Sequence, residues 1–200
     1  LVGLAALLPW TAVQAQSTFE APPSGGALAE ALGALPISFV ENQGQWEGPA
    51  RFAVNRGTLA ALFEPAAMLL AQRDGAEGVF VRLAFEGAAG ATWIEGERAL
   101  PGVRNYFVGD AAAWRTDVLG YASIRYHGLY AGIDLRVRAR AEHLEYDLLL
   151  ERASDLEQVV VRCDGIECLE IDAAGNLVLA TALGDLTQPP PLTWQVRPDG

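Results

Sequence analysis

Apolar and polar residues alternate with a period of two along most of the chain after Pro36. Short apolar runs are separated by turn residues, as at Arg56-Gly57 and Asp74-Gly75. This pattern is typical of antiparallel strands joined by tight turns. We therefore expect an all-β fold, an antiparallel β-sandwich of many short strands and hairpins with little helix. The expected strands lie near residues 37–40, 50–55, 58–63, 67–72, 78–85, 92–95, 121–127, 132–139, 144–150, 157–163, 168–172, 176–181 and 192–196, with single helical turns at 27–34 and 110–115.

The clearest hairpin joins residues 133–139 to residues 144–150. Odd positions are apolar in the first run and even positions in the second, so both apolar sets share a face in one register only. A loop at 140–143 gives that register. It predicts two cross-strand ion pairs on the opposite face, Arg136 with Asp147 and Arg138 with Glu145. Each such pair contributes about 0.2–1 kcal/mol.

The N-terminal segment has the features of an export signal. Residues 1–8 are an uncharged apolar run, and Val13-Gln14-Ala15 places small side chains at the positions that precede a signal-peptidase cut. Eight residues are too short to span a membrane, which needs about 20. We expect a signal peptide at 1–15 that lacks its cationic start, a flexible leader at 16–35 and the β-sandwich domain at 36–200.

A hairpin-turn signal, Asp199-Gly200, follows the last expected strand. No return strand stands after it in the sequence. We therefore expect the sheet to continue past Gly200, so that the domain is truncated at its C-terminal hairpin.

The two cysteines, Cys163 and Cys168, flank a four-residue turn between two strand-like runs. In a hairpin with that loop they would lie opposite each other, at a separation that a disulfide can span. Export to an oxidising compartment favours such a bond. A disulfide is therefore predicted, with free thiols as the alternative.

Composition excludes several chemistries. All 14 basic residues are arginine, so there is no lysine nucleophile or Schiff-base lysine. The formal net charge of −11 argues against a nucleic-acid partner, which requires clustered cations. The hydrophobic content of 51% excludes disorder of the whole chain.

Candidate catalytic and metal-binding groups are few. His143, Glu145 and Asp147 project from one strand face and could hold a divalent ion, but the expected arginine partners would repel it. Asp172, Asn176 and Asp185 could bind calcium, although such residues in turns usually make local hydrogen bonds. Glu145 or Asp147 could serve a glycoside hydrolase, which needs two free carboxylates at a cleft. The sequence favours no catalytic residue, no metal and no cofactor.

The aromatic residues suggest a binding function. Trp46 and Trp114 could stack against a sugar ligand, with the amides of Asn42, Gln43 and Gln45 beside them. The competing interpretation is structural, because large aromatics often cover a core and buried amides satisfy irregular backbone. Trp93 and Trp194 belong to the same set of candidates.

Five segments occur in the order found in a known family. They are 36–45 (PISFVENQGQ), 100–109 (LPGVRNYFVG) followed by Trp114-Arg115-Thr116, 121–135 (YASIRYHGLYAGIDL), 144–147 (LEYD) and 171–179 (IDAAGNLVL). Their order resembles the N-terminal domain of uncharacterised function that precedes SBBP (bacterial β-propeller) repeats in secreted and surface proteins.

This resemblance implies an exported all-β domain with propeller repeats or adhesion modules downstream, and it supplies no catalytic residue. We expect a non-catalytic structural or interaction module of an exported bacterial protein, outside the cell, at its surface or in the periplasm. Its expected partner is the downstream repeat region of the same protein, or a cell-surface glycan or protein. A carbohydrate-binding module is the alternative, and a glycoside hydrolase is a more distant one. No membrane span is expected.

Overall fold

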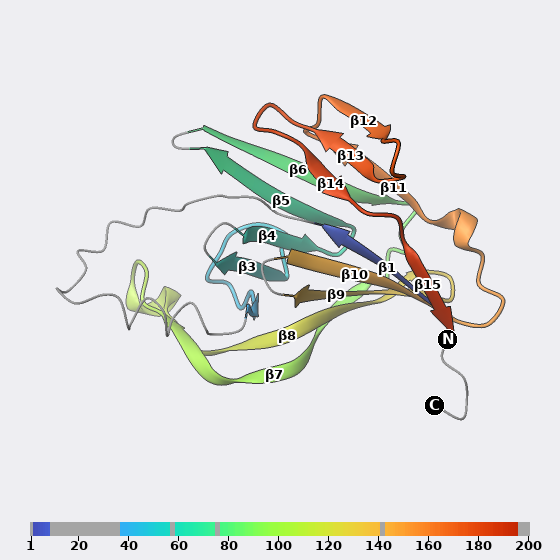
Figure 1. Cartoon of the computed structure of the whole chain (residues 1–200). Helices are drawn as coiled ribbons and strands as arrows, with labels where there is room; N and C mark the ends of the chain where they lie inside the picture. The colour runs from blue at the N-terminus through green and yellow to red at the C-terminus, as the bar shows by residue number, and fades with distance from the viewer. Residues whose placement is uncertain (1, 9–36, 57–58, 75–76, 141–142, 196–200) are drawn as a thin grey trace.

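The computed structural model describes residues 2–8, 37–56, 59–74, 77–140 and 143–195. Nearly all the regular structure is antiparallel β-strand, which confirms the predicted all-β class (Figure 1). The strands are β1 (Val2–Leu8), β2 (Phe39–Glu41), β3 (Phe52–Arg56), β4 (Leu59–Glu64), β5 (Ala67–Asp74), β6 (Glu77–Glu86), β7 (Trp93–Tyr106), β8 (Arg115–Tyr130), β9 (Ile133–Arg140), β10 (His143–Leu150), β11 (Val160–Asp164), β12 (Cys168–Ile171), β13 (Leu177–Ala180), β14 (Leu186–Gln188) and β15 (Leu192–Gln195).

The described residues also contain two short 3₁₀ turns, η1 (Ala111–Ala113) and η2 (Leu156–Gln158). The first falls within the helical turn expected at 110–115. The turn expected at 27–34 and the expected signal-peptide cut lie outside the described residues. In the described part of the chain, no helix is long and apolar enough to cross a membrane.

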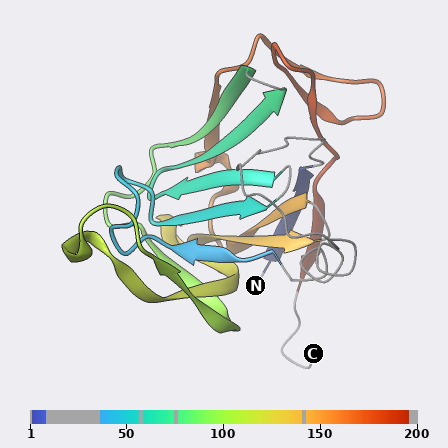
Figure 2. The ribbon, with the colours of Figure 1, turned by 90° about the vertical axis from the view of Figure 1, so that its left-hand side faces the viewer.

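The strands form a strongly curled sheet of twelve strands and a second sheet of three. The large sheet has the order β11-β6-β5-β4-β3-β2-β8-β9-β10-β1-β15, and β7 pairs with β8 beside this path. The small sheet has the order β12-β13-β14. Figure 2 shows the strands fanning from β5 and β6 at the top to the β7–β8 pair at the lower left.

The core lies on the inner face of the curl. Alternate residues of strands between β6 and β10 of the large sheet meet there, and Leu179 and Leu186 of the small sheet pack onto the same cluster. Alternation with a period of two produces this arrangement, because successive side chains in a strand point to opposite faces. The largest fully buried side chains include Phe39, Phe63, Leu70, Ile124, Tyr126, Leu135 and Leu179.

Two polar links fasten the small sheet to the large one. The buried Gln72 of β5 accepts a hydrogen bond from Thr181 Oγ1 at 2.7 Å and donates to the Leu183 carbonyl at 3.1 Å. Tyr146 of β10 is linked to Gln188 of β14 at 2.9 Å. These bonds satisfy groups that would be costly to bury alone.

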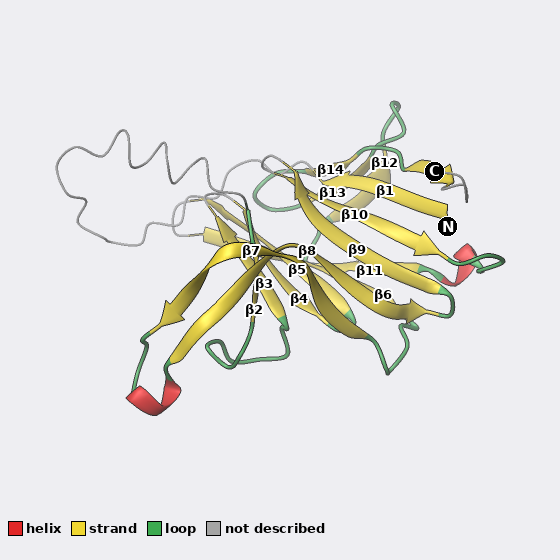
Figure 3. Ribbon diagram, turned by 90° about the horizontal axis from the view of Figure 1, so that it is seen from below, coloured by secondary structure: helices red, strands yellow, loops and turns green. Residues whose placement is uncertain are grey.

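β7 and β8 are much longer than the short strands expected at 92–95 and 121–127. They form a two-stranded arm that extends beyond the body, and η1 lies at its tip (Figure 3). The register shifts between Ala99 and Val103. Gly102, within that bulge, has a φ of 87°, and Arg98, just before it, has a φ of 56°. A bulge inserts unpaired residues and strengthens the local twist, so the arm curves away from the sheet.

The predicted hairpin between residues 133–139 and 144–150 is confirmed as β9–β10. The pairs include Val137 with Tyr146 and Leu135 with Leu148. Both apolar sets face the core, and the charged set faces the other side.

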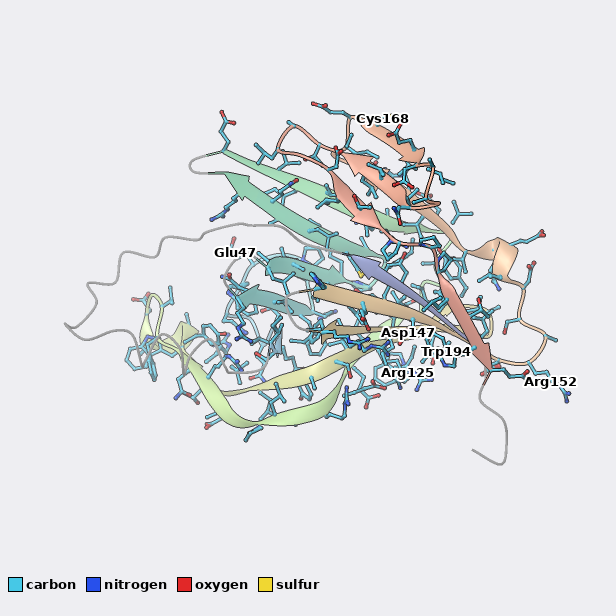
Figure 4. The ribbon with its side chains drawn as sticks, in the orientation of Figure 1. Glu47, Arg125, Asp147, Arg152, Cys168 and Trp194 are labelled. Atoms are coloured by element: carbon cyan, nitrogen blue, oxygen red, sulfur yellow. The ribbon has the colours of Figure 1, made fainter. Side chains whose placement is uncertain are left out.

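The predicted Cys163–Cys168 disulfide is wrong, because both residues are free thiols on different sheets. Cys163 lies in β11 opposite Leu83 of β6, whereas Cys168 lies in β12 opposite Ala180 of β13. The four intervening residues are therefore a link between two sheets and not a hairpin turn. Figure 4 labels Cys168 on the small sheet, at the top of the view.

Candidate interaction surface

The tip of the β7–β8 arm exposes large apolar side chains. Phe107 is 59% exposed, Val108 73% and Trp114 45%, and Val103 on the same arm is 49% exposed. The Phe107 and Trp114 rings meet edge to face, with centroids 5.1 Å apart. The indole Nε1 of Trp114 donates to the Gly109 carbonyl at 3.3 Å. We call these four residues, Val103, Phe107, Val108 and Trp114, the tip cluster.

The loop between β2 and β3 holds the tip in place. Arg115 Nε donates to the Gln43 carbonyl at 2.7 Å. Trp46 of the loop is half-buried and meets Tyr106 of β7 edge to face, with centroids 5.5 Å apart. The exposed aromatics therefore stand on a braced support, which lowers the entropy lost when a partner orders them.

The predicted contact residues Trp46 and Trp114 thus belong to two segments that lie together. The amides of Asn42 and Gln45 do not point to a ligand. Asn42 Nδ2 donates to the carbonyls of Ala50 (2.8 Å) and Trp46 (3.0 Å), and Gln45 Nε2 donates to the Glu41 carbonyl at 2.6 Å. Their side-chain oxygens accept loop N–H groups. Both amides shape the loop.

Sequence reasoning missed Val103, Phe107 and Val108 as surface residues. The run 103–108 (VRNYFV) breaks the alternation, with three apolar residues in succession at its end. Such a run in an exposed strand end is the signal that could have marked this surface.

A ladder of alternating charges crosses β7, β8, β9 and β10 on the face opposite the core. Arg136 forms a two-point contact with Glu97 of β7, through Nε at 2.7 Å and Nη2 at 3.0 Å. Arg125 of β8 contacts Asp134 at 2.6 Å. The Arg125–Asp134 pair joins the neighbouring strands β8 and β9, where opposite signs stabilise the pairing, whereas the Arg136–Glu97 pair reaches across β8 from β9 to β7.

Arg138 connects to both carboxylates of β10. Its Nε lies 2.8 Å from Glu145 and its Nη1 2.5 Å from Asp147. The register predicted for these residues is confirmed, but Arg136, opposite Asp147, turns its guanidinium to Glu97. Figure 4 labels Asp147 and Arg125 on the large sheet.

Glu145 and Asp147 are almost fully buried, with exposed fractions of 2% and 1%. Burial raises the pKa of Asp147 above its ordinary value, against the opposing effect of Arg138 and Arg136. Arg138 therefore compensates two carboxylates that would be costly to bury alone.

A cavity of about 490 Å³ lies over the ladder, lined by Glu97, Arg98, Arg136 and Arg138. Glu97 holds Arg136, and the β10 carboxylates hold Arg138. The lining is therefore largely charge-compensated.

The two metal-site candidates find other roles. Among the described residues, no group of three or more His, Cys, Asp or Glu side chains is arranged to hold a metal ion. Asp172 accepts hydrogen bonds from Asn176 and from the backbone N–H of Ala174, which lower its pKa. It shapes the turn before β13.

We expect Glu97→Gln to destabilise the protein by about 1–2 kcal/mol at neutral pH, because it removes a charge-assisted two-point contact. Burial opposes ionisation of Glu97, but the contacts with Arg136, together with the Ser123 hydrogen bond and the charge of Arg125, outweigh burial and lower the pKa of Glu97 below its ordinary value. A lowered folded-state pKa gives stability that is present above the unfolded-state pKa and lost as pH falls through the folded one. The difference between the two proteins should therefore shrink in acid.

Urea unfolding from pH 7 to pH 3 measures this difference. Glu47→Gln, at an exposed site, is the control and should leave the unfolding midpoint unchanged. A Glu97→Gln deficit that stays constant down to pH 3 would contradict the assigned role of the ion pair.

The fold and its arm define an all-β domain built on one curled sheet, with a braced apolar tip and a charge-compensated outer face. The chain belongs to the family described as domain of unknown function DUF7948, whose model matches residues 39–200. Searches of the curated proteins and of the solved structures gave no match.

Proposed function

We propose that this domain is a non-catalytic interaction module of an exported bacterial protein, and that the tip cluster is its contact surface. The observation that carries the proposal is the exposure of four large apolar side chains on a braced arm. Apolar patches of this kind mark interaction sites in folded proteins. Aromatic side chains with little freedom to lose are efficient anchors for a partner.

The charge ladder supports the non-catalytic part of the proposal. A glycoside hydrolase needs one carboxyl group that is free to act as an acid and another that is free to attack or to activate water. Glu145 and Asp147 share Arg138 and lie buried. Their pairing counts against that reaction.

Features of the sequence support export. The apolar run at 1–8 and the Val13-Gln14-Ala15 pattern are typical of a secretory signal peptide. The segment order resembles domains that precede SBBP β-propeller repeats. The proposed partner is therefore the repeat region that follows this domain in the same protein.

The chemistry of the tip favours a protein surface over a sugar. Sugar recognition needs free hydrogen-bonding groups beside an aromatic face. Asn42 and Gln45 are both engaged within their loop, and the Trp114 indole N–H is bound to Gly109. An apolar protein surface needs neither group.

We expect the double variant Phe107→Ser/Trp114→Ser to release the domain from the following region of the full-length protein. Small-angle scattering should show a larger radius of gyration, and proteolysis after residue 200 should accelerate about tenfold or more, as expected when about 1.4 kcal/mol of contact energy is lost. Trp93→Ser is the matched control, since Trp93 is 53% exposed at the other end of β7. Equal behaviour of the two variants would overturn the assignment of the tip cluster.

The second candidate function is carbohydrate binding, and the observation that favours it is the exposed indole ring of Trp93. Its ring stacks on His127 with centroids 4.1 Å apart and planes 9° from parallel. His127 Nε2 lies 2.9 Å from Glu95, so polar groups stand beside an exposed indole. Calorimetric titration of the protein with bacterial cell-wall oligosaccharides tests this candidate. Binding that Trp93→Ser abolishes and the tip variant preserves would favour it over the first.

A further inference from the structure

The position of β1 in the large sheet carries a further inference. β1 lies between β10 and β15, paired with β10 over seven residues and with β15 over four, antiparallel to both. Figure 1 shows β1 in this place beside β10 and β15. Yet Val2–Leu8 belongs to the segment that the proposed export would remove. In the exported protein, the facing edges of β10 and β15 would both lose their partner.

An empty position there would be costly. A strand edge presents a row of unpaired N–H and C=O groups, and β10 is a core strand whose Leu144 and Leu148 are 3% and 5% exposed. Proteins cover such edges with another strand, and an antiparallel hairpin neighbour is the simplest one.

The residues that follow β15 indicate the source of a strand that fits this place. β15 ends at Gln195, and the hairpin-turn signal Asp199-Gly200 follows it closely. A strand returned by that turn would run antiparallel to β15 and beside it. β1 likewise runs antiparallel to β15 and pairs with it, so the returned strand would have the direction of β1 and share one of its two neighbours.

The buried carboxylates of β10 supply an independent indication. Glu145 Oε1 and Asp147 Oδ1 are buried and accept no hydrogen bond from any residue the structure describes, although Arg140 Nη1 lies 3.5 Å from Glu145 Oε1. In the backbone register, Glu145 lies opposite Leu7 of β1 and Asp147 opposite Ala5. Buried acceptors are nearly always satisfied in native proteins.

We propose that the place of β1 is a strand-acceptor site, filled in the exported protein by the segment that follows Gly200. This inference rests on the proposed export, because a retained signal peptide would keep the place occupied. The returning strand is apolar at alternate positions, opposite Leu144, Tyr146 and Leu148. At the positions opposite Glu145 and Asp147 it carries hydrogen-bond donors.

Amide hydrogen exchange of the exported full-length protein tests the proposal, with N-terminal sequencing of the same sample. Sequencing should begin near Gln16. Peptides covering residues 143–150 should exchange on the order of 100-fold more slowly than an unpaired edge, and so should the peptide directly after Gly200.

A matched pair of variants sharpens the test. Gly200→Val disfavours the left-handed conformation that a tight Asp-Gly turn requires, and should accelerate exchange in residues 143–150 about tenfold. Gly90→Val is the control, because its added side chain would meet open space at an ordinary φ, and should change nothing there.

Three other results of the exchange and sequencing measurements would contradict the acceptor site or the proposed export. Fast exchange of residues 143–150 in a protein that starts near Gln16 would overturn the acceptor site while leaving export intact. Slow exchange there with fast exchange after Gly200 would show a different occupant and also overturn it. An N-terminus at or before Val2 would instead refute the proposed export.

Discussion

Arg138→Met should be among the most destabilising substitutions in this protein, with an expected loss of about 3–5 kcal/mol in the free energy of unfolding at neutral pH. Removal of one member from a buried charge cluster is strongly destabilising, and here it would take from Asp147 its contacting cation and leave Glu145 with only the longer contact to Arg140. Arg138 is bound to Glu145 and Asp147, which are 2% and 1% exposed. Methionine keeps much of the apolar stem and removes the charge. Urea unfolding followed by tryptophan fluorescence measures the loss.

The pH dependence of this loss follows from the same carboxylates. Burial already raises the pKa of Asp147, and without Arg138 the pKa should rise further. An acid whose folded-state pKa is raised destabilises the fold increasingly as pH rises through that range. The deficit of Arg138→Met should therefore be largest at neutral pH and shrink in acid.

Arg162→Met is the matched control. Arg162 also contacts two carboxylates, those of Glu86 and Asp164, but all three side chains are about half exposed. Surface pairs of this kind contribute little to stability. The triple variant Arg138→Met/Glu145→Gln/Asp147→Asn should recover part of the loss, because no buried charge remains. If Arg138→Met were no more destabilising than Arg162→Met, the buried cluster would not have the role assigned to it.

The register of the β9–β10 hairpin could be predicted because every constraint on it is local. Alternation fixes which residues face the core, and a short connection fixes the pairing, although the strands reach Arg140 and His143 and so leave a shorter connection than the expected loop at 140–143. The opposite charges of Arg138 and Glu145 favour the same register. Agreement between pattern, turn and charge is what makes a local prediction reliable.

The true partner of Arg136 could not be predicted, because Glu97 lies 39 residues away in sequence. Its position depends on how β7 pairs with β8, and that pairing contains two register shifts. The sequence of the β7–β8 arm also resembles a loop more than a strand. Gly96, Gly102 and Gly120 interrupt the alternation that marks a strand.

Gly96 shows why such a residue belongs in a strand. An added Cβ there would lie 2.4 Å from the ring of Tyr121, so the ring covers the glycine. Glycine in a strand often marks a close approach of this kind. The sequence shows the glycine but cannot show that the ring of Tyr121 lies against it.

For the candidate contact residues, too, the sequence predicted some features, and others depended on the folded structure. The sequence identified both segments of the tip region through Trp46 and Trp114. It could not show that Asn42 and Gln45 turn inward, because their partners are carbonyl groups fixed by the loop conformation. The exposure of Phe107 depends on the length of the β7–β8 arm, which the sequence pattern did not predict.

The second large effect is expected at Gly165, the residue that sends the chain from the large sheet to the small one. Gly165 follows β11 directly and has a φ of +82°. An added Cβ would lie 2.1 Å from the backbone oxygen of Phe80 in β6. Gly165→Ala should therefore cost about 3 kcal/mol, part from the left-handed conformation and part from displacement of a core strand. Thermal and urea unfolding measure this cost.

Gly175→Ala separates the two contributions. Gly175 has nearly the same φ, +84°, but its added Cβ would meet Pro190 Cγ at 3.4 Å, an ordinary contact. It should therefore cost about 1 kcal/mol, from conformation alone. Similar losses for the two variants would mean that β6 yields at Phe80. In that case the close approach of Gly165 to Phe80 would not hold the link between the sheets, and the separation of Cys163 from Cys168 would need another cause.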